Sequence, residues 1–283
     1  KNLFIILFLI LFLNNCSKNK NIEIAVIEED QIETQMIKAY KEGMIAFRDS
    51  QYLDAAKKFN EAETLFPQSD WAPKSALMAA YSYYVQDYYS DCIAELERFI
   101  KIYSKHKNLD YAFYLLAVSY YEQIVDEKKD LNSILKSKEY FEYIKNNYPN
   151  TEYALDSEFK LDLIADILAS KEVYLGRYYI DRKKWVPAIN RFKTVIEDYD
   201  TTMYVEEALY RIVEIYFILG LTNEAEKYAK LLGYNYQSSE WYEKSYMIFD
   251  KKYKKIEKSK IKKAKNKTDF VLKKFKNLFN SNE

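Results

Sequence analysis

The sequence offers few side chains that are spaced for catalysis. His106 is the only histidine, which excludes a His-rich metal site and leaves a single candidate imidazole base. Walker-type and dinucleotide Gly loops, His-Glu-x-x-His, Cys-x-x-Cys and Gly-x-Ser-x-Gly patterns do not occur in it. His106 lies between Lys105 and Lys107, and we expect it to be structural or solvated. The sequence therefore predicts a protein that is not an enzyme and holds no metal.

The N-terminal residues are typical of an export signal. Lys1 is followed by an unbroken apolar run from Leu3 to Leu13. Such a run is too short to span a bilayer, which takes about 20 residues, so residues 1–15 are predicted to be a secretory signal peptide. The alternative is an uncleaved hydrophobic anchor, which would still leave the remainder outside the cytoplasm.

Cys16 is the residue whose surroundings predict a chemical modification. The stretch Leu13-Asn14-Asn15-Cys16 resembles a bacterial lipobox, although Asn15 stands where that pattern prefers Gly, Ala or Ser. The resemblance implies diacylglycerol and an N-acyl lipid on Cys16, a lasting anchor, and no other cofactor is expected. Because Ser17 and not Asp follows, it also implies the periplasmic face of the outer membrane. Cys92 is then left without a disulfide partner.

Composition favours long helices joined by short loops. The 283 residues include only 4 Gly and 4 Pro, too few for a β-sandwich, a barrel or a Gly-rich nucleotide fold. Hydrophobic residues make up 49%, enough for a sizeable core.

Internal repeats organise the chain. Small, aromatic and Pro residues at the spacing of a tetratricopeptide unit occur at Gly43, Tyr52, Ala55, Phe59, Ala62 and Pro67. Later units follow. The largest separation between the aromatic positions of successive units is 51 residues, from Phe141 to Phe192. It is filled by a Pro-free stretch from Tyr153 to about Asp181, which predicts one long helix. The prediction is an all-α, tetratricopeptide-type superhelix of about five repeats, in two halves joined by the long helix. Protein binding in a concave groove is the default function of such a stack.

Five segments follow from this pattern. After the signal peptide we expect a lipidated N-terminus and tether (16–36), units one to three (37–149), the long helix with units four and five (150–250), and a Lys-rich tail (251–283). The tail has 13 Lys against three acidic residues, and the whole chain is neutral. The tail is either a solvated end or a contact for anionic lipid or an acidic partner.

Two further functional classes are disfavoured. A helical repeat protein can carry a peptidoglycan-cleaving domain with a Glu acid, but residues such as Glu95 and Glu97 are expected to be solvated, and the sequence shows no separate catalytic domain. Nucleic-acid binding would use the tail with its interleaved aromatic rings, but an exported chain rarely meets nucleic acid.

Several stretches together resemble one family. They are Trp71–Ala76, Asp110–Leu115, Gly176–Tyr179, Ala188–Phe192 and Glu206–Leu209. In order and spacing these resemble the BamD family, lipoproteins of the β-barrel assembly machinery, from the lipobox to about Tyr242. The tail is not covered by the resemblance.

The resemblance implies partners as well as a location. The C-terminal repeats would hold the periplasmic domains of a BamA-like insertase, and the N-terminal repeats would receive unfolded outer-membrane β-barrel proteins through their aromatic-ending last strand. Other lipoproteins of the machinery are further candidate partners. The alternative function is a generic periplasmic repeat scaffold in envelope synthesis or cell division, which would share the unit pattern but not the stretches at 71–75 and 110–115.

Candidate contact residues follow from the unit spacing and the resemblance. The first helix of each N-terminal unit is expected to line a substrate groove with Tyr40, Met44, Phe47, Arg48, Lys74, Leu77, Tyr81, Tyr84, Tyr111, Tyr114 and Tyr121. The insertase interface is expected at Trp185, Asn190, Arg191, Tyr210 and Glu214. The alternative is that Trp185, Tyr210 and several of the 29 Tyr pack between helices.

Overall fold

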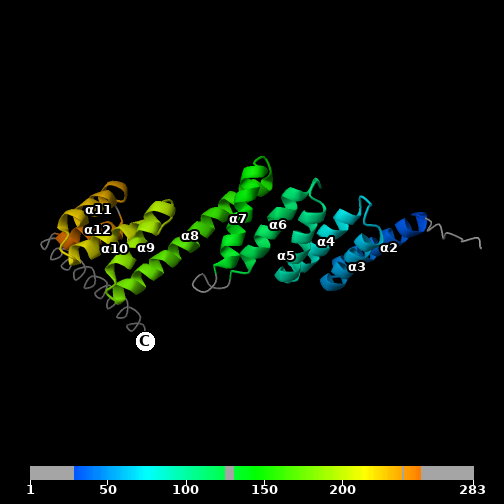
Figure 1. Ribbon diagram of the computed structural model, residues 1–283, viewed down its shortest axis with the longest axis horizontal. Coiled ribbons are helices and arrows are strands. Elements are labelled where there is room, and N and C mark those ends of the chain that lie inside the picture. The colour runs from blue at the N-terminus through cyan, green and yellow to red at the C-terminus, as the bar shows by residue number, and fades with distance from the viewer. Residues whose placement is uncertain (1–28, 125–130, 238, 250–283) are drawn as a thin grey trace, which may run out of the picture. The chain divides into compact units, whose positions relative to one another are not determined.

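The computed structural model describes residues 29–124, 131–237 and 239–249. Within these ranges every regular element is an α-helix (Figure 1). The all-α repeat fold predicted from the sequence is thereby confirmed. The predicted signal peptide, Cys16 and the Lys-rich tail lie outside the described residues.

The helices follow one another with short connections. Their bounds are α2 Glu29–Arg48, α3 Tyr52–Leu65, α4 Ala72–Val85, α5 Tyr89–Ile102, α6 Leu109–Glu122, α7 Asn132–Asn147, α8 Glu152–Asp181, α9 Trp185–Asp198, α10 Val205–Ile218, α11 Thr222–Asn235 and α12 Glu240–Phe249. Most are 14 residues long, the size of one helix of a tetratricopeptide pair. Helix α8 has 30 residues and confirms the long helix predicted from Tyr153 to about Asp181.

The described chain forms two compact units that divide between Tyr88 and Tyr89, and each is described by itself. In the first unit α2 packs on α3 and α3 on α4. Phe59 of α3 is fully buried, together with Ala55 and Ala79. A Cβ on Gly43 would lie 2.8 Å from the Phe59 ring, so the absence of a side chain there lets α2 approach α3 closely.

Helix α2 begins earlier than the sequence pattern suggests. Residues 29–36 belong to it, although 16–36 were predicted to be a tether. Met36 is fully buried and packs with Ala39 and Ala62, which explains why the helix extends back past the first repeat position. The end of the tether nearest the repeats is therefore part of the fold.

The second unit contains α5 to α12. Consecutive helices pack on one another, and α12 packs on both α10 and α11. The division into units falls inside the predicted second repeat and not near residue 150, because α8 packs on α7 as well as on α9 and so holds both sides of that point in one unit.

The repeat signature residues have the packing roles that their spacing predicts. Phe141 and Phe192 are fully buried, and a Cβ on Gly176 would lie 2.5 Å from the Phe192 ring. Gly220 has φ +77° in the turn between α10 and α11, a conformation that L side chains avoid. The core of the C-terminal repeats joins residues of α8 to α11, among them Val173, Phe192, Leu209 and Leu232.

Candidate functional site

The first unit carries an aromatic surface on α2 and α4. The Phe47 and Tyr81 rings are stacked with centroids 5.7 Å apart, and Tyr81 and Tyr84 are stacked at 6.3 Å. All three side chains are partly exposed. The structure thus brings together three of the predicted groove residues from two different helices.

A pocket of about 390 Å³ lies along α2, and its lining residues Tyr40 and Met44 pack against the same buried cluster as Phe47. It is lined by Ile37, Tyr40, Lys41, Met44, Ile45, Arg48 and Trp71. Tyr40 forms its rigid side, because its ring contacts Phe59 at 5.3 Å and Trp71 at 5.1 Å, and burial raises the pKa of its phenol. The pocket is therefore mainly apolar and aromatic, with two cations at its edge.

The cations of this surface differ in their surroundings. Arg48 lies exposed in the last turn of α2, and among the described residues neither Arg48 nor Lys41 forms an ion pair. Lys74 instead places its Nζ over the Trp71 ring at 4.7 Å, a cation–π contact. Arg48 is thus better placed than Lys74 to meet a carboxylate.

Leu77 does not belong to this surface. It is only 5% exposed and belongs to the buried hydrophobic core. The repeat spacing predicted it as a groove residue, but transferring an apolar side chain from water to the core is favourable.

The other predicted groove residues belong to the second unit. Tyr111 and Tyr114 both contact the Tyr153 ring, at 5.7 and 5.0 Å, and the Tyr114 hydroxyl donates to Asp156 Oδ2 at 2.7 Å. Tyr121 lies 6.5 Å from the Phe141 ring and under Lys160 Nζ, and burial raises the pKa of its phenol. Residues of α8 therefore contact all three of these side chains, which are partly buried.

The predicted insertase residues lie on α9 and α10. Asn190 is exposed, whereas Trp185 and Tyr210 pack against the core of the second unit. Arg191 pairs with Glu172 of α8 at 3.1 Å, and Glu214 accepts a hydrogen bond from Arg211 Nη1 at 2.9 Å. Trp185 and Tyr210 thus have a packing role in the second unit, as the alternative prediction for them expected.

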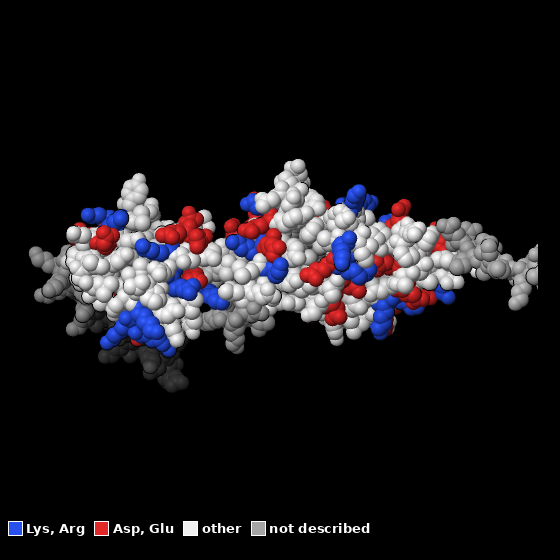
Figure 2. Space-filling model, viewed as in Figure 1, with Lys and Arg blue, Asp and Glu red and all other residues white. Residues whose placement is uncertain are grey.

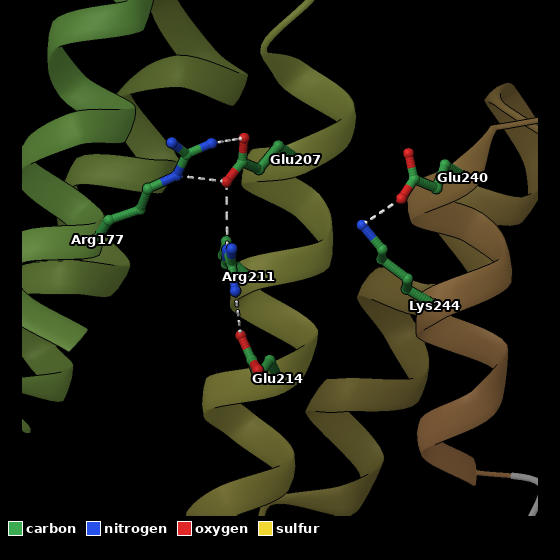
Figure 3. Close-up of polar contacts among 6 residues, drawn as sticks. All are labelled: Arg177, Glu207, Arg211, Glu214, Glu240 and Lys244. Carbon is green, nitrogen blue, oxygen red and sulfur yellow. Dashed lines mark hydrogen bonds and ion pairs between the residues drawn. The ribbon is translucent and has the colours of Figure 1, made fainter. Parts of the chain in front are cut away.

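A chain of ion pairs joins α8 to α10 (Figure 3). The Arg177 guanidinium donates through Nε and Nη2 to the two oxygens of Glu207, with Nε 2.7 Å from Oε1. Arg211 also donates to Glu207, at 3.2 Å, and continues the chain to Glu214. Glu207 is buried, and the paired arginines satisfy its charge. Burial alone would lower the pKa of Arg211, but its bonds and charge interactions with Glu214 and Glu207 raise it.

We call the ion-paired residues Arg177, Glu207, Arg211 and Glu214 the polar row. The aromatic ring of Trp241 of α12 lies at its end. Tyr210 lies 5.3 Å from it, while Arg211 and Lys244 approach its ring at 5.7 and 4.1 Å. Arg177, Glu207 and Trp241 were not among the predicted site residues. Arg177 and Glu207 fall in stretches that carry the family resemblance, Gly176–Tyr179 and Glu206–Leu209. The resemblance was therefore the sequence signal that could have identified these two residues.

His106 and Cys92, the imidazole and the thiol among the described residues, are held in packing roles. The His106 ring lies edge-on to Phe99 at 5.7 Å, and its Nδ1 accepts from the Asn108 backbone N–H at 3.3 Å. Cys92 is buried against the Ser119 hydroxyl, and burial raises the pKa of its thiol to about 11. In the part of the chain that the structure describes, His, Cys, Asp and Glu form no group able to hold a metal ion.

Charge is mixed over the described helices. Figure 2 shows Lys and Arg interspersed with Asp and Glu on the face in view, with uncharged surface between them. None of the described helices combines the length and apolar character needed to cross a membrane. The surfaces that stand out are therefore the aromatic pocket on α2 and the polar row on α8, α10 and α12.

Comparison with known proteins gives the family. Residues 32–231 match the YfiO model, described as an outer membrane lipoprotein. The chain is 39% identical over 238 residues to the outer membrane protein assembly factor BamD of Rickettsia prowazekii, covering 84% of this chain and 92% of that protein. It is 39% identical over 197 residues to the same factor of Caulobacter vibrioides, with 70% and 65% covered, and 30% identical over 212 residues to that of Neisseria meningitidis, with 71% and 79% covered. The chain belongs to the BamD family of outer membrane lipoproteins.

Proposed function

We propose that this chain is a non-enzymatic scaffold of outer-membrane protein assembly, held at the periplasmic face of the outer membrane by lipid on Cys16. The family match and the relatives named as assembly factors support the role. The same matches disfavour a generic periplasmic scaffold of envelope synthesis or cell division. The lipid anchor rests on the lipobox-like sequence before Cys16.

The N-terminal surface is proposed to receive the end of an unfolded barrel protein. The observation that carries this is the pocket on α2, where Tyr40, Met44 and Trp71 form an apolar, aromatic lining and Arg48 lies at the edge. Burial of the peptide's last aromatic side chain in this pocket would be favourable, and the Arg48 guanidinium would attract the peptide's C-terminal carboxylate. One pocket thus suits both features of an aromatic-ending peptide.

The C-terminal repeats are proposed to hold the insertase. Asn190 is exposed on α9, and Arg177 keeps about half of its side chain exposed while bound to buried Glu207. A guanidinium fixed in this way loses little side-chain freedom when a partner carboxylate binds its exposed edge. The polar row on α8 and α10 therefore offers a preorganised surface for a folded periplasmic domain.

Site-specific photocrosslinking of the full chain in intact cells tests both contacts. A benzophenone amino acid at Met44 should give adducts with barrel proteins, and one at Asn190 should give adducts with a barrel protein that carries repeated periplasmic domains. Lys57, exposed on α3, is the control position and should give neither adduct. Equal yields at Met44 and Lys57 would remove the proposed substrate site, and absence of the insertase adduct at Asn190 would remove the proposed interface.

A further inference from the structure

A second hollow lies between the last two described helices. It measures about 500 Å³ and is lined by Glu226, Ala229, Lys230, Gly233 and Tyr234 of α11, by Gln237 after it, and by Tyr242, Ser245, Tyr246 and Phe249 of α12. Tyr234 is 84% exposed and Tyr246 45% exposed, unusually high values for aromatic rings at the edge of an apolar hollow. The walls of the hollow are therefore aromatic and open to a ligand.

The floor of the hollow contains small residues and an unsatisfied hydroxyl. Ala229 and Gly233 are four residues apart on α11, so they share one helix face. Ser245 is 1% exposed, and its Oγ has no hydrogen-bond partner in the described part of the chain. Buried polar atoms of folded proteins are nearly always bonded, so this one points to a group that the described residues do not supply.

The chain itself provides a matching segment. Phe249, the last described residue, lines the hollow, and 34 residues follow it. Among them Val271, Leu272, Phe275, Leu278 and Phe279 are spaced as the apolar face of an amphipathic helix, with Lys273, Lys274 and Lys276 at the positions between. The 21 residues from 250 to 270 make a longer connection than packed helices need, so residues 271–279 can reach the hollow.

Charge and repeat architecture favour the same occupant. Residues 251–283 carry 13 Lys against three acidic residues, about +10, and in a neutral chain the remainder carries about −10. The basic tail is therefore attracted to the acidic remainder of its own chain as well as to other anions. In addition, α12 packs on α10 and α11 and is the last described helix, and repeat stacks end in a capping element with a polar outer side.

We propose that residues 271–279 bind in the hollow between α11 and α12 and act as the C-terminal cap of the repeats. Apolar side chains of the segment fill the space between Tyr234, Tyr242 and Tyr246, and the lysines face outward. A polar group of the segment bonds the Ser245 hydroxyl. Seven of the ten lining residues, from Gly233 to Phe249, lie beyond residue 231, where the family match ends.

The test is photocrosslinking within the full chain, followed by peptide mapping. A benzophenone amino acid in place of Phe275 should form its main adduct inside the same molecule, on residues 226–249. The same group in place of Lys274, on the polar side of the pattern, is the matched control and should give about tenfold less of that adduct. Ala229→Trp, which fills the hollow, should lower the Phe275 adduct by about tenfold, the effect of displacing one aromatic side chain.

The alternative occupants give distinguishable results. Adducts of the Phe275 position with lipid would show that the segment lies on a membrane, and adducts between two molecules would show a second copy in the hollow. Either result, or an intramolecular adduct that Ala229→Trp leaves unchanged, would overturn the proposal. Circular dichroism of the Ala229→Trp chain must match that of the parent, and Lys230→Trp at the rim provides a second variant if it does not.

Discussion

Single residues decide how closely the repeat helices approach. A Cβ on Gly176 would lie 2.5 Å from the Phe192 ring, and Phe192 is fully buried. Helix propensity alone would make Gly176→Ala more stable by about 1 kcal/mol. We expect the overlap to outweigh that gain, with a net loss of about 1–3 kcal/mol in the free energy of unfolding. Urea denaturation measures the sign, and a more stable variant would contradict the described packing.

A buried carboxylate between two arginines is a second residue-level test. Glu207→Gln would leave Arg177 and Arg211 facing a neutral amide, and we expect a loss of about 1–3 kcal/mol in the free energy of unfolding. Glu240→Gln removes an exposed partner of Lys244 and is the matched control, with an effect within about 0.5 kcal/mol. Equal effects in the two variants would mean that the row from Arg177 to Glu214 contributes no more than a surface pair.

Among the elements, those specified by local pattern could be predicted from the sequence. The long helix α8 follows from a Pro-free stretch between two aromatic repeat positions. Phe59, Phe141 and Phe192 fall at the aromatic position of the repeat spacing, and all three are fully buried.

Features that depend on contacts between distant residues could not be predicted. The repeat spacing made Leu77 and Lys74 groove residues, but Leu77 is buried and Lys74 lies over the Trp71 ring. Nothing in the spacing of Arg177 and Glu207, 30 residues apart, indicates that they pair, because that depends on how α8 and α10 pack. The beginning of α2 was missed because the residues before Met36 are polar and resemble a linker.

Helix α2 therefore supports a prediction about its own N-terminal end. Met36 is fully buried, so Met36→Ala should lower the free energy of unfolding by about 2–5 kcal/mol through lost burial and the cavity left behind. Met203→Ala is the control, because that side chain is 75% exposed and should change stability little. Thermal melting compares the two. Identical melting temperatures would mean that residues 29–36 act as a tether after all.

On the scale of the whole molecule, the lipid anchor proposed at Cys16 lies outside the described helices. If that proposal holds, Cys16→Ala is expected to leave a soluble or inner-membrane-retained precursor, because the proposed acyl chains would supply nearly all of the membrane affinity. Cys92→Ala, which changes the buried cysteine, should still sediment with outer membranes. Membrane fractionation at high salt measures both. Sedimentation of the Cys16→Ala chain with outer membranes would show that another part of the chain is the anchor.

The central claim is that the N-terminal repeats bind the aromatic end of an unfolded barrel protein, and a peptide titration tests it most directly. The probe is the last strand of a barrel protein, ending in Phe with a free carboxylate, titrated into the full chain. Replacing Tyr81 and Tyr84 with Ala should weaken binding at least tenfold, roughly 1.4 kcal/mol, while Tyr178→Ala, a change of the same kind on α8, should not. Unchanged peptide affinity in the Tyr81→Ala, Tyr84→Ala chain, with circular dichroism and melting intact, would contradict the claim.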